Sequence, residues 1–443
     1  MQRVRHLAQR LAERTPADRD RYLDFLRVAA LLLVVLGHWL VRVVVAPDGV
    51  PEAQYLLALQ PGWQVATLLF QVMPLFFLVG GVVNLRSWRR ARAEGHGATD
   101  WLRGRAQRLL RPAVPLVLAV AVLGLGAEAL APGRAILDPW IALIPLWFLA
   151  AYLAVTALTP WSAAVHARGH SPVLMAVAAG LALGVDLLRL GGVGPVAGTQ
   201  PLVGLPNFVL IWGAVHQLGH LWADGRLPAR PLGQLGLAAA GAGALAVLIG
   251  ALGWPLSMVP VAGTLAPNNA APPTLALLAL ALVQTGLALG LRAPAERWLA
   301  RPMVWAVVAL AGARLMTLFL WHQMALVVAV NVAVPAGWLP VPEAVDLRYW
   351  RLRPLWLGAA ALVLAGLVAA MGRLEGRHST PLPGGAAATL LGVGLVAAGL
   401  AALLWAPLAP PGVVTTAAVS GVALFVAGCR ALGITWRSTT RQA

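Results

Sequence analysis

Two ionisable side chains, Arg27 and His38, interrupt the first apolar run of the chain, YLDFLRVAALLLVVLGHWL at residues 22–40. On an α-helix, this spacing brings two side chains to within about 20° of one another around the axis and about 16 Å apart along it. An ionisable group inside a membrane span costs about 2.5 kcal/mol or more, and such groups commonly line a functional path. Histidine can take a proton as a general base near neutral pH. The alternative is that Arg27 only extends to the membrane boundary and that His38 is a packing residue with satisfied hydrogen bonds.

The composition is that of an integral membrane protein. Of 443 residues, 60% are hydrophobic and 11% are charged, whereas about 25% of the residues of a soluble domain are charged. Spans of about 20 residues with short connections fill the whole length, so the sequence predicts no separate soluble domain. The net charge of +17 indicates membrane topology, and no nucleic-acid partner is expected.

Apolar runs of near-spanning length, most of them bounded by Pro, Gly or Arg, predict an all-α polytopic membrane bundle of about 12 transmembrane helices. The runs are residues 28–46, 63–85, 113–131, 140–159, 173–188, 202–222, 233–253, 273–291, 313–334, 354–371, 386–406 and 413–432. The stretch 303–334 is interrupted by Gly312 and Arg314, which predicts a short interfacial or re-entrant piece followed by one span. Ala-rich and Gly-rich runs at 235–253 and 386–402 predict close helix packing through small side chains.

Arginines gather in alternate connections, which predicts that the N-terminus and the C-terminus are both cytoplasmic. One connection expected on the inner side runs from Arg86 to Arg111. The other inner connections contain Arg168, Arg226, Arg230, Arg292, Arg297, Arg301, Arg373 and Arg377. The outer connections are short and almost neutral. Arg42 and Arg314 are expected inside spans.

A pair of arginines, Arg108 and Arg111, closes the connection after the second predicted span, in RLLRP. Three residues apart, they share one face of a helix. Such a pair at a membrane surface can bind phosphate in a bidentate manner and so suits a nucleotide-like donor. The alternative is that these arginines serve topology and contact anionic lipid headgroups.

Two histidines, His216 and His220, lie four residues apart near the end of the sixth predicted span, with Asp224 four residues further on. A zinc site needs a third and a fourth ligand, and no HExxH-type base accompanies the pair. We therefore favour hydrogen bonding and predict no metal. The single cysteine, Cys429, excludes an internal disulfide and a cysteine-based metal cluster.

Three further polar residues lie in apolar runs. His322, in MTLFLWHQMALVV, could orient His38, bind an acceptor or only join two helices. Asp186 and Arg189 lie three residues apart near the end of the fifth predicted span, which predicts an interfacial ion pair and not a catalytic group.

Five segments, taken in order along the chain, resemble the membrane acyltransferase-3 family, whose members O-acylate sugars, surface polymers and antibiotics. They are R-x10-H from Arg27 to His38 with Leu23 and Asp24 ahead of it, MPLFFLVGG ending at Gly80 and Gly81, RLLRP from Arg108 to Pro112, LWFLAAYL around Trp147, and LFLWH ending at His322. The resemblance implies a ten-helix acyltransferase core at 22–371, preceded by an Arg-rich cytoplasmic tail at 1–21. The region 372–443 then holds two additional helices and a short cytoplasmic tail.

The resemblance also implies a reaction. No cofactor is bound permanently, and an acyl-CoA, above all acetyl-CoA, enters from the cytoplasm as a co-substrate. Arg108 and Arg111 bind the donor, with Arg27 near its thioester, and His38 is the general base toward a hydroxyl of a carbohydrate, cell-envelope or secondary-metabolite acceptor. His322, Trp147 and Asp24 are expected to support the site. An acyl-histidine intermediate on His38 is the alternative path, and the cell inner membrane, with its lipids, is the expected location.

A different class of function stays open at this point. A secondary transporter or a lipid or glycan flippase could use a buried Arg and His for a proton-coupled path. Such transporters often show repeats between their halves and carboxylates in the middle of the membrane. The sequence shows no clear repeat, and its spans are nearly free of central carboxylates.

Overall fold

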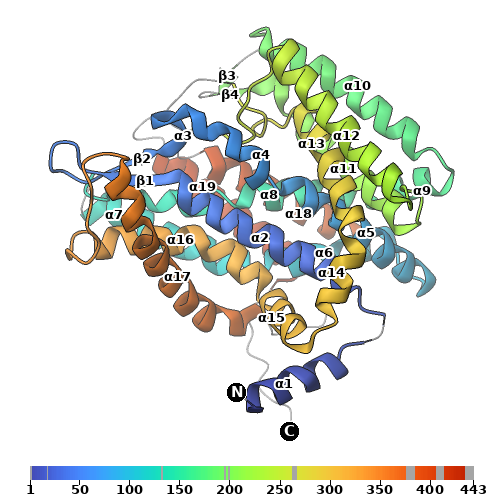
Figure 1. The fold of residues 1–443 in the computed structure, drawn as a ribbon, viewed down its shortest axis with the longest axis horizontal. Helices are drawn as coiled ribbons and strands as arrows, with labels where there is room; N and C mark the ends of the chain where they lie inside the picture. Colours follow the sequence, from blue (N-terminus) through green and yellow to red (C-terminus); the bar gives the residue numbers. More distant parts are fainter. Residues whose placement is uncertain are drawn as a thin grey trace. The chain divides into compact units, whose positions relative to one another are not determined.

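The structure is a computed structural model that describes residues 2–16, 18–130, 133–193, 196–197, 200–261, 267–375, 385–405 and 414–434. Nearly all of the described chain is helical (Figure 1), which confirms the predicted helical class. Two short two-stranded sheets depart from it, β1 (Arg42–Val45) with β2 (Glu52–Tyr55) and β3 (Val196–Ala197) with β4 (Gln200–Pro201). Arg377 and the end of the chain after residue 434 lie outside the described residues.

The chain forms two compact units. Unit 1 comprises Met1–Val43, Gln54–Ser87 and Leu158–Leu315, and unit 2 comprises Val44–Ala53, Trp88–Ala157 and Met316–Ala443. Helix α5 (Met73–Ala93) begins in unit 1 and ends in unit 2.

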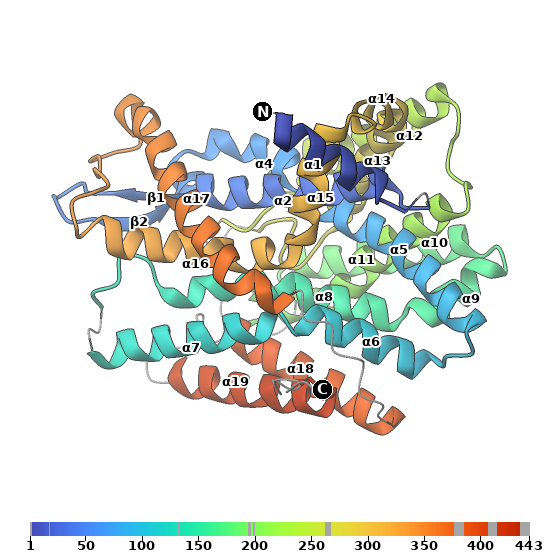
Figure 2. The same cartoon turned by 90° about the horizontal axis from the view of Figure 1, so that it is seen from below.

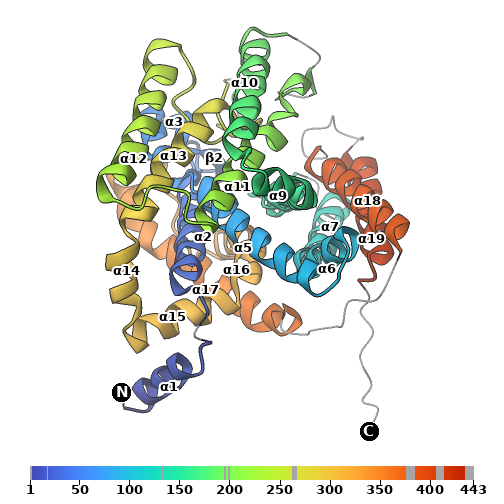
Figure 3. The same cartoon turned by 90° about the vertical axis from the view of Figure 1, so that its right-hand side faces the viewer.

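In unit 1, α12 lies beside α13, and α10 lies beside α11 (Figure 3). The other helices of unit 1 are α1 (Gln2–Glu13), α2 (Arg21–Val41), α3 (Leu56–Leu59), η1 (Pro61–Ala66), α4 (Thr67–Phe70), α9 (Thr159–Ala167), α10 (Ser171–Leu190), η3 (Leu202–Gly204), α11 (Asn207–Ala223), α12 (Pro231–Ala246), η4 (Val247–Ala251), α13 (Leu275–Gly290), α14 (Arg292–Leu299) and α15 (Pro302–Ala313).

In unit 2, α18 and α19 lie side by side, α18 against α6 and α19 against α7 (Figure 2). The helices of unit 2 are α6 (Ala98–Leu110), α7 (Ala113–Leu130), η2 (Pro139–Leu143), α8 (Leu146–Ala157), α16 (Leu315–Ala333), α17 (Leu347–Glu375), α18 (Ala386–Trp405) and α19 (Val414–Ala431).

Within the described residues, ten helical segments are long and apolar enough to cross a membrane. They are Arg21–Val41, Pro61–Ala93, Ala113–Leu130, Pro139–Ala157, Ser171–Leu190, Leu202–Ala223, Pro231–Ala251, Leu315–Ala333, Leu347–Met371 and Ala386–Leu404. The pair α13 and α14, bent by 54°, makes up to eleven. The chain is thus a multi-pass membrane protein, and the count of about 12 stays a prediction because α15 and Thr416–Ala431 are shorter apolar helices.

The first span differs from the predicted run 28–46 at both of its ends. Helix α2 begins at Arg21, where the Asp20 side chain accepts a hydrogen bond from the Leu23 backbone N–H at 3.2 Å and caps the helix. The helix ends at Val41, because the β-branched residues that follow form β1 and pair with β2. Arg42 therefore lies just after a helix and not inside a span, and Arg314 lies at the break between α15 and α16.

Glycines allow the close helix packing that the two small-residue runs predicted. A Cβ atom on Gly241 of α12 would lie 2.6 Å from the carbonyl oxygen of Ala279 on α13. A Cβ atom on Gly428 of α19 would lie 2.7 Å from the carbonyl oxygen of Gly392 on α18. Since both distances are shorter than a van der Waals contact, any larger residue would push these helix pairs apart.

Candidate active site

One unbroken helix, α2, carries both Arg27 and His38, as their spacing predicted. Arg27 lies in its second turn, and its Nη1 is 3.8 Å from Oδ1 of Asp24. The other oxygen of Asp24 lies 2.7 Å from Nε of Arg19. Asp24 thus contacts Arg27, whose side chain is 41% exposed, and the supporting role of Asp24 stays a prediction.

A polar cavity of about 630 Å³ opens beside the N-terminal end of α2 in unit 1. We call it the arginine pocket. It is lined by Thr15, Pro16, Asp18, Arg19, Asp20, Arg21, Tyr22, Arg86, Arg292, Glu296, Leu299 and Ala300. Four of these side chains are cationic and three are acidic, so the lining carries a small net positive charge.

The centre of the arginine pocket is the Asp20 carboxylate, whose Oδ2 lies 3.2 Å from Nη2 of Arg292 and 3.6 Å from Nη1 of Arg86. Nε of Arg292 donates to Oε1 of Glu296 at 2.8 Å, and its guanidinium lies 5.7 Å from the centre of the Tyr22 ring. The Arg86 side chain is 51% exposed and that of Arg292 is 35% exposed. Each guanidinium therefore keeps donors for a further anion.

Sequence reasoning placed Arg86 and Arg292 among the arginines that set topology and did not connect them. They are far apart in the chain and belong to no motif, so only the fold brings them to Asp20. The Asp20 side chain also caps α2. The two arginines are therefore tied to the start of the helix that carries Arg27 and His38.

His38 lies in the last turn of α2, at the end away from the arginine pocket. The neighbouring Gly37 faces Phe70 of α4, since a Cβ at Gly37 would lie 3.1 Å from Cδ1 of that ring. Just beyond the helix, the Arg42 guanidinium lies 5.0 Å from the centre of the Tyr55 ring. Desolvation raises the pKa of the Tyr55 phenol and Arg42 opposes that rise, so at neutral pH this end carries a protonated phenol.

The predicted donor arginines Arg108 and Arg111 belong to unit 2, at the end of α6. Arg108 is exposed and Arg111 is half-buried. Arg103, one helical turn earlier, is buried, and its Nε donates to Oγ1 of Thr389 on α18 at 2.9 Å. On this helix, Arg103 therefore has a structural contact with α18, and Arg108 and Arg111 lie at the C-terminal end.

Trp147 and His322, the two supporting residues predicted in later motifs, lie in one region of unit 2. Phe148, next to Trp147, contacts Phe319 with ring centroids 5.3 Å apart. The Phe319 carbonyl oxygen lies 2.6 Å from Nδ1 of His322, which is fully buried. Because a carbonyl oxygen only accepts, Nδ1 of His322 carries the proton of this hydrogen bond. A role of His322 in orienting His38 stays a prediction.

The histidine pair His216 and His220 belongs to a buried polar network in unit 1. Nε2 of His216 lies 3.1 Å from Nδ2 of Asn84, which confirms the hydrogen-bonding interpretation for this residue. The His220 ring lies between those of His216 and His166, with centroid distances of 4.9 and 5.6 Å. Asp224, considered above as a metal ligand, pairs instead with His166. Among the described residues, no group of three His, Cys, Asp or Glu side chains could hold a metal ion.

Ser171, His166 and Asp224 have the residue types of a catalytic triad. Oγ of Ser171 lies 2.7 Å from Nδ1 of His166, and Oδ2 of Asp224 lies 2.9 Å from Nε2. Ser171 is, however, fully buried, and its hydroxyl also accepts a hydrogen bond from Gln217. No substrate carbonyl can reach this hydroxyl, so the three residues join the ends of α9, α10 and α11 and are not a nucleophilic site.

The predicted pairing of Asp186 with Arg189 is present as a Coulombic attraction, but the hydrogen-bond partners of both side chains are other groups. Asp186 accepts hydrogen bonds from Asn207 at 2.9 Å and from the Leu275 backbone N–H at 2.8 Å, and so caps α13. Arg189 donates instead to the carbonyl oxygen of Asn268 at 2.8 Å. Both side chains are buried, and each stabilises the non-helical connection before α13, which offers backbone partners that the sequence does not show.

Comparison with known proteins gives one match. The model of the acyltransferase-3 family, described as an acyltransferase domain, matches residues 20–370, about four fifths of the chain. Neither the search of curated proteins nor that of solved structures found a match. The matched residues include α2, Arg86 and Arg292 and end before α18.

Proposed function

The chain belongs to the acyltransferase-3 family and is a membrane acyltransferase, and on that premise we propose that it moves an acyl group from cytoplasmic acyl-CoA to a hydroxyl of a carbohydrate, cell-envelope or secondary-metabolite acceptor. The observation that supports this proposal most is the position of the arginine pocket. It adjoins the start of the same unbroken helix that carries Arg27 and, in its last turn, His38.

The arginine pocket suits the phosphates of the donor. Its volume of about 630 Å³ falls within the range of about 300 to 1,000 Å³ that is usual for small-molecule sites. Arg86 and Arg292 share one carboxylate and retain donors, and guanidinium groups bind phosphate oxygens through paired hydrogen bonds. Arg108 and Arg111 stay candidates for further contacts with the donor.

The length of α2 favours CoA over a compact acyl donor. Arg21 and His38 are about 26 Å apart by helical rise, whereas Arg27 and His38 are about 16 Å apart. In CoA the thioester lies at the end of a long flexible arm, away from the phosphates. Phosphates in the arginine pocket would therefore leave the thioester free to lie along α2, past Arg27 and toward His38.

At the thioester, the proposed reaction needs a base and a stabilised oxyanion. The neutral His38 imidazole takes the hydroxyl proton of the acceptor as the acceptor oxygen forms its bond to the thioester carbonyl carbon. The tetrahedral oxyanion collapses, the carbon–sulfur bond breaks, and the CoA thiolate takes up the proton. In the alternative path, His38 itself attacks the thioester, releases the thiolate and passes the acyl group to the acceptor.

The test is a CoA-release assay on purified protein in detergent, with acetyl-CoA, a panel of hydroxylated acceptors and a thiol reagent. The buried thiol of Cys429 adds no accessible thiol of its own. His38→Ala is expected to lower acceptor-dependent CoA release by about 10² to 10⁴. The matched control is His96→Ala, because the His96 side chain is 56% exposed in a connection. Wild-type release from the His38 variant would remove its assigned role.

A further inference from the structure

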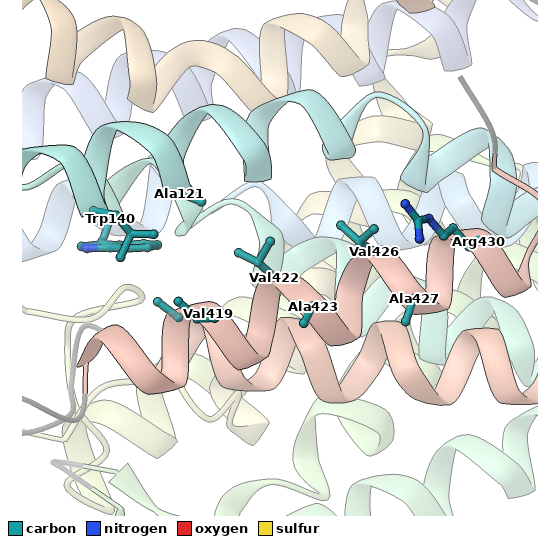
Figure 4. Close-up of a pocket in the computed structure, with 10 residues that line it drawn as sticks. Ala121, Trp140, Val419, Val422, Ala423, Val426, Ala427 and Arg430 are labelled. Carbon is teal, nitrogen blue, oxygen red and sulfur yellow. The ribbon is translucent and has the colours of Figure 1, made fainter. Parts of the chain in front are cut away.

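An apolar groove of about 490 Å³ lies in unit 2, outside the site proposed for acyl transfer (Figure 4). Its walls come from α7, η2 and α19. It is lined by Ala121, Leu125, Trp140, Ala418, Val419, Val422, Ala423, Val426, Ala427 and Arg430. Arg430 is the one charged side chain of this lining.

The lining residues of α19 follow one face of the helix. Val419, Val422, Val426 and Arg430 are spaced by three, four and four residues, the spacing of a single helical stripe. From Val419 to Arg430 the stripe is about 16 Å long. One leaflet of the hydrocarbon core is about 15 Å thick, so the groove has the length of one acyl chain in one leaflet.

The two ends of the groove differ in chemistry. At one end the Trp140 ring packs on α7, and its Nε1 donates to Oε1 of Glu128 at 3.2 Å. At the other end lies Arg430, in the last turn of α19 (Figure 4). Its side chain is exposed, and no ion pair of its guanidinium occurs within the described part of the chain. A cation at one end of an apolar stripe matches a molecule with an anionic head and a hydrocarbon tail.

Contacts with α6 hold the groove in place. Arg103 donates to Thr389 on α18, and Nε2 of Gln107 donates to the Leu432 carbonyl oxygen at 2.5 Å, just after α19. Small side chains such as Ala121 and Ala423 leave the space open. Helix α7 and η2 lie within the residues that the family model matches, whereas α19 lies beyond them. The groove therefore forms where the additional part of the chain packs against the matched part.

We propose that the groove is a binding site for one anionic phospholipid of the bilayer, with one acyl chain along Val419, Val422 and Val426 and the phosphate on Arg430. Basic residues at such positions between helices attract anionic headgroups. The sequence predicts a cytoplasmic C-terminus, which places Arg430 in the leaflet where anionic lipids concentrate. The lipid fills the space between α7 and α19 and supports the docking of the last two helices.

The experiment is native mass spectrometry of the full chain in detergent micelles with equal amounts of phosphatidylglycerol and phosphatidylcholine. The wild type is expected to retain one phosphatidylglycerol in preference to phosphatidylcholine. Arg430→Gln is expected to lower this preference about fivefold. The matched control, Arg226→Gln, removes an exposed arginine outside the groove and leaves the preference unchanged.

A second pair of variants tests the apolar part of the groove. Ala423→Phe fills it and is expected to abolish retention of either lipid, whereas Ala417→Phe, on another face of α19 outside the lining, keeps it. Two results overturn the proposal. These are an unchanged lipid preference in Arg430→Gln and lipid retained by Ala423→Phe. If Ala423→Phe retains its lipid but loses a protein dimer, the groove is instead an interface between two copies of the chain.

Discussion

Replacing Arg292 with Gln tests whether the arginine pocket binds the phosphates of the donor. Arg292 begins α14, and its guanidinium contacts Asp20 and Glu296. Glutamine keeps a polar side chain but loses the positive charge and the planar fork. The matched control is Arg297→Gln, which removes an exposed arginine of the same helix that does not line the pocket.

The magnitude follows from the exposure of Arg292. A hydrogen bond to a charged group contributes about 1.5 to 3 kcal/mol, and the 35% exposure of this side chain places its phosphate contact at the low end. About 1.4 kcal/mol corresponds to a tenfold rise in the KM for acetyl-CoA. The kcat should stay unchanged, because the phosphates are bound equally in the ground state and the transition state. The lost ion pairs are partly exposed, so the free energy of unfolding should fall by no more than about 1 kcal/mol.

The assay is steady-state CoA release at several acetyl-CoA concentrations and two salt concentrations. The KM of the wild type should rise with salt, since salt screens exposed charges, and the KM of Arg292→Gln should rise less. An equal KM in Arg292→Gln and Arg297→Gln would refute the reasoning. Phosphate binding would then have to be sought at Arg108 and Arg111. A lower kcat at constant KM would instead place Arg292 near the reacting atoms.

Three further outcomes are expected. Arg27→Lys should lower the rate of acyl transfer about tenfold or more, because lysine keeps the charge but loses the paired hydrogen-bond donors. Unchanged CoA release would mean that Arg27 only extends to the membrane boundary. Acetyl phosphate should not replace acetyl-CoA as the acyl donor, because its phosphate is directly bonded to its acetyl group and cannot lie in the arginine pocket while the carbonyl lies near His38. Equal yields of acylated acceptor from both donors would contradict the proposed placement of the donor along α2. His166→Ala should lower the free energy of unfolding by about 1 to 3 kcal/mol, because it removes the hydrogen bonds of His166 to buried Ser171 and to Asp224. A wild-type melting curve in detergent would show that this network does not stabilise the helix ends.

The sequence predicted the helices well and their ends less well. Apolar length alone indicates a span, and the small-residue faces of α12 and α18 could be read from composition. The C-terminal end of α2 could not be predicted in this way, because Val43 to Val45 are as apolar as the helix before them. These residues form a strand because their side chains are β-branched and because β2 is available as a pairing partner. Helix ends depend on such competing partners, which an apolar run does not reveal.

The candidate site was predicted only where its residues share one element. Arg27, Asp24 and His38 lie on one helix, so their spacing fixed their relation. The grouping of Arg86 and Arg292 around Asp20 arises from the packing of three segments, and no spacing encodes it. Arginine is also a poor signal in this chain, because all 33 basic residues are Arg and most of them can equally well be interpreted as signals of membrane topology. Asp20 was the available clue, since a carboxylate at a helix start both caps the helix and attracts cations.

The carboxylate at the centre of the arginine pocket also bears on how a donor would bind. Asp20 holds Arg86 and Arg292 toward the start of α2, so both guanidinium groups are positioned before a ligand arrives, which reduces the ordering that binding must impose. The same negative charge repels a phosphate and lowers the affinity that two free arginines would give. Under the proposed function, a donor present at high cytoplasmic concentration would tolerate that loss. Binding energy would then be used in interactions made along α2 as the thioester reaches His38, where it would raise kcat and not only affinity.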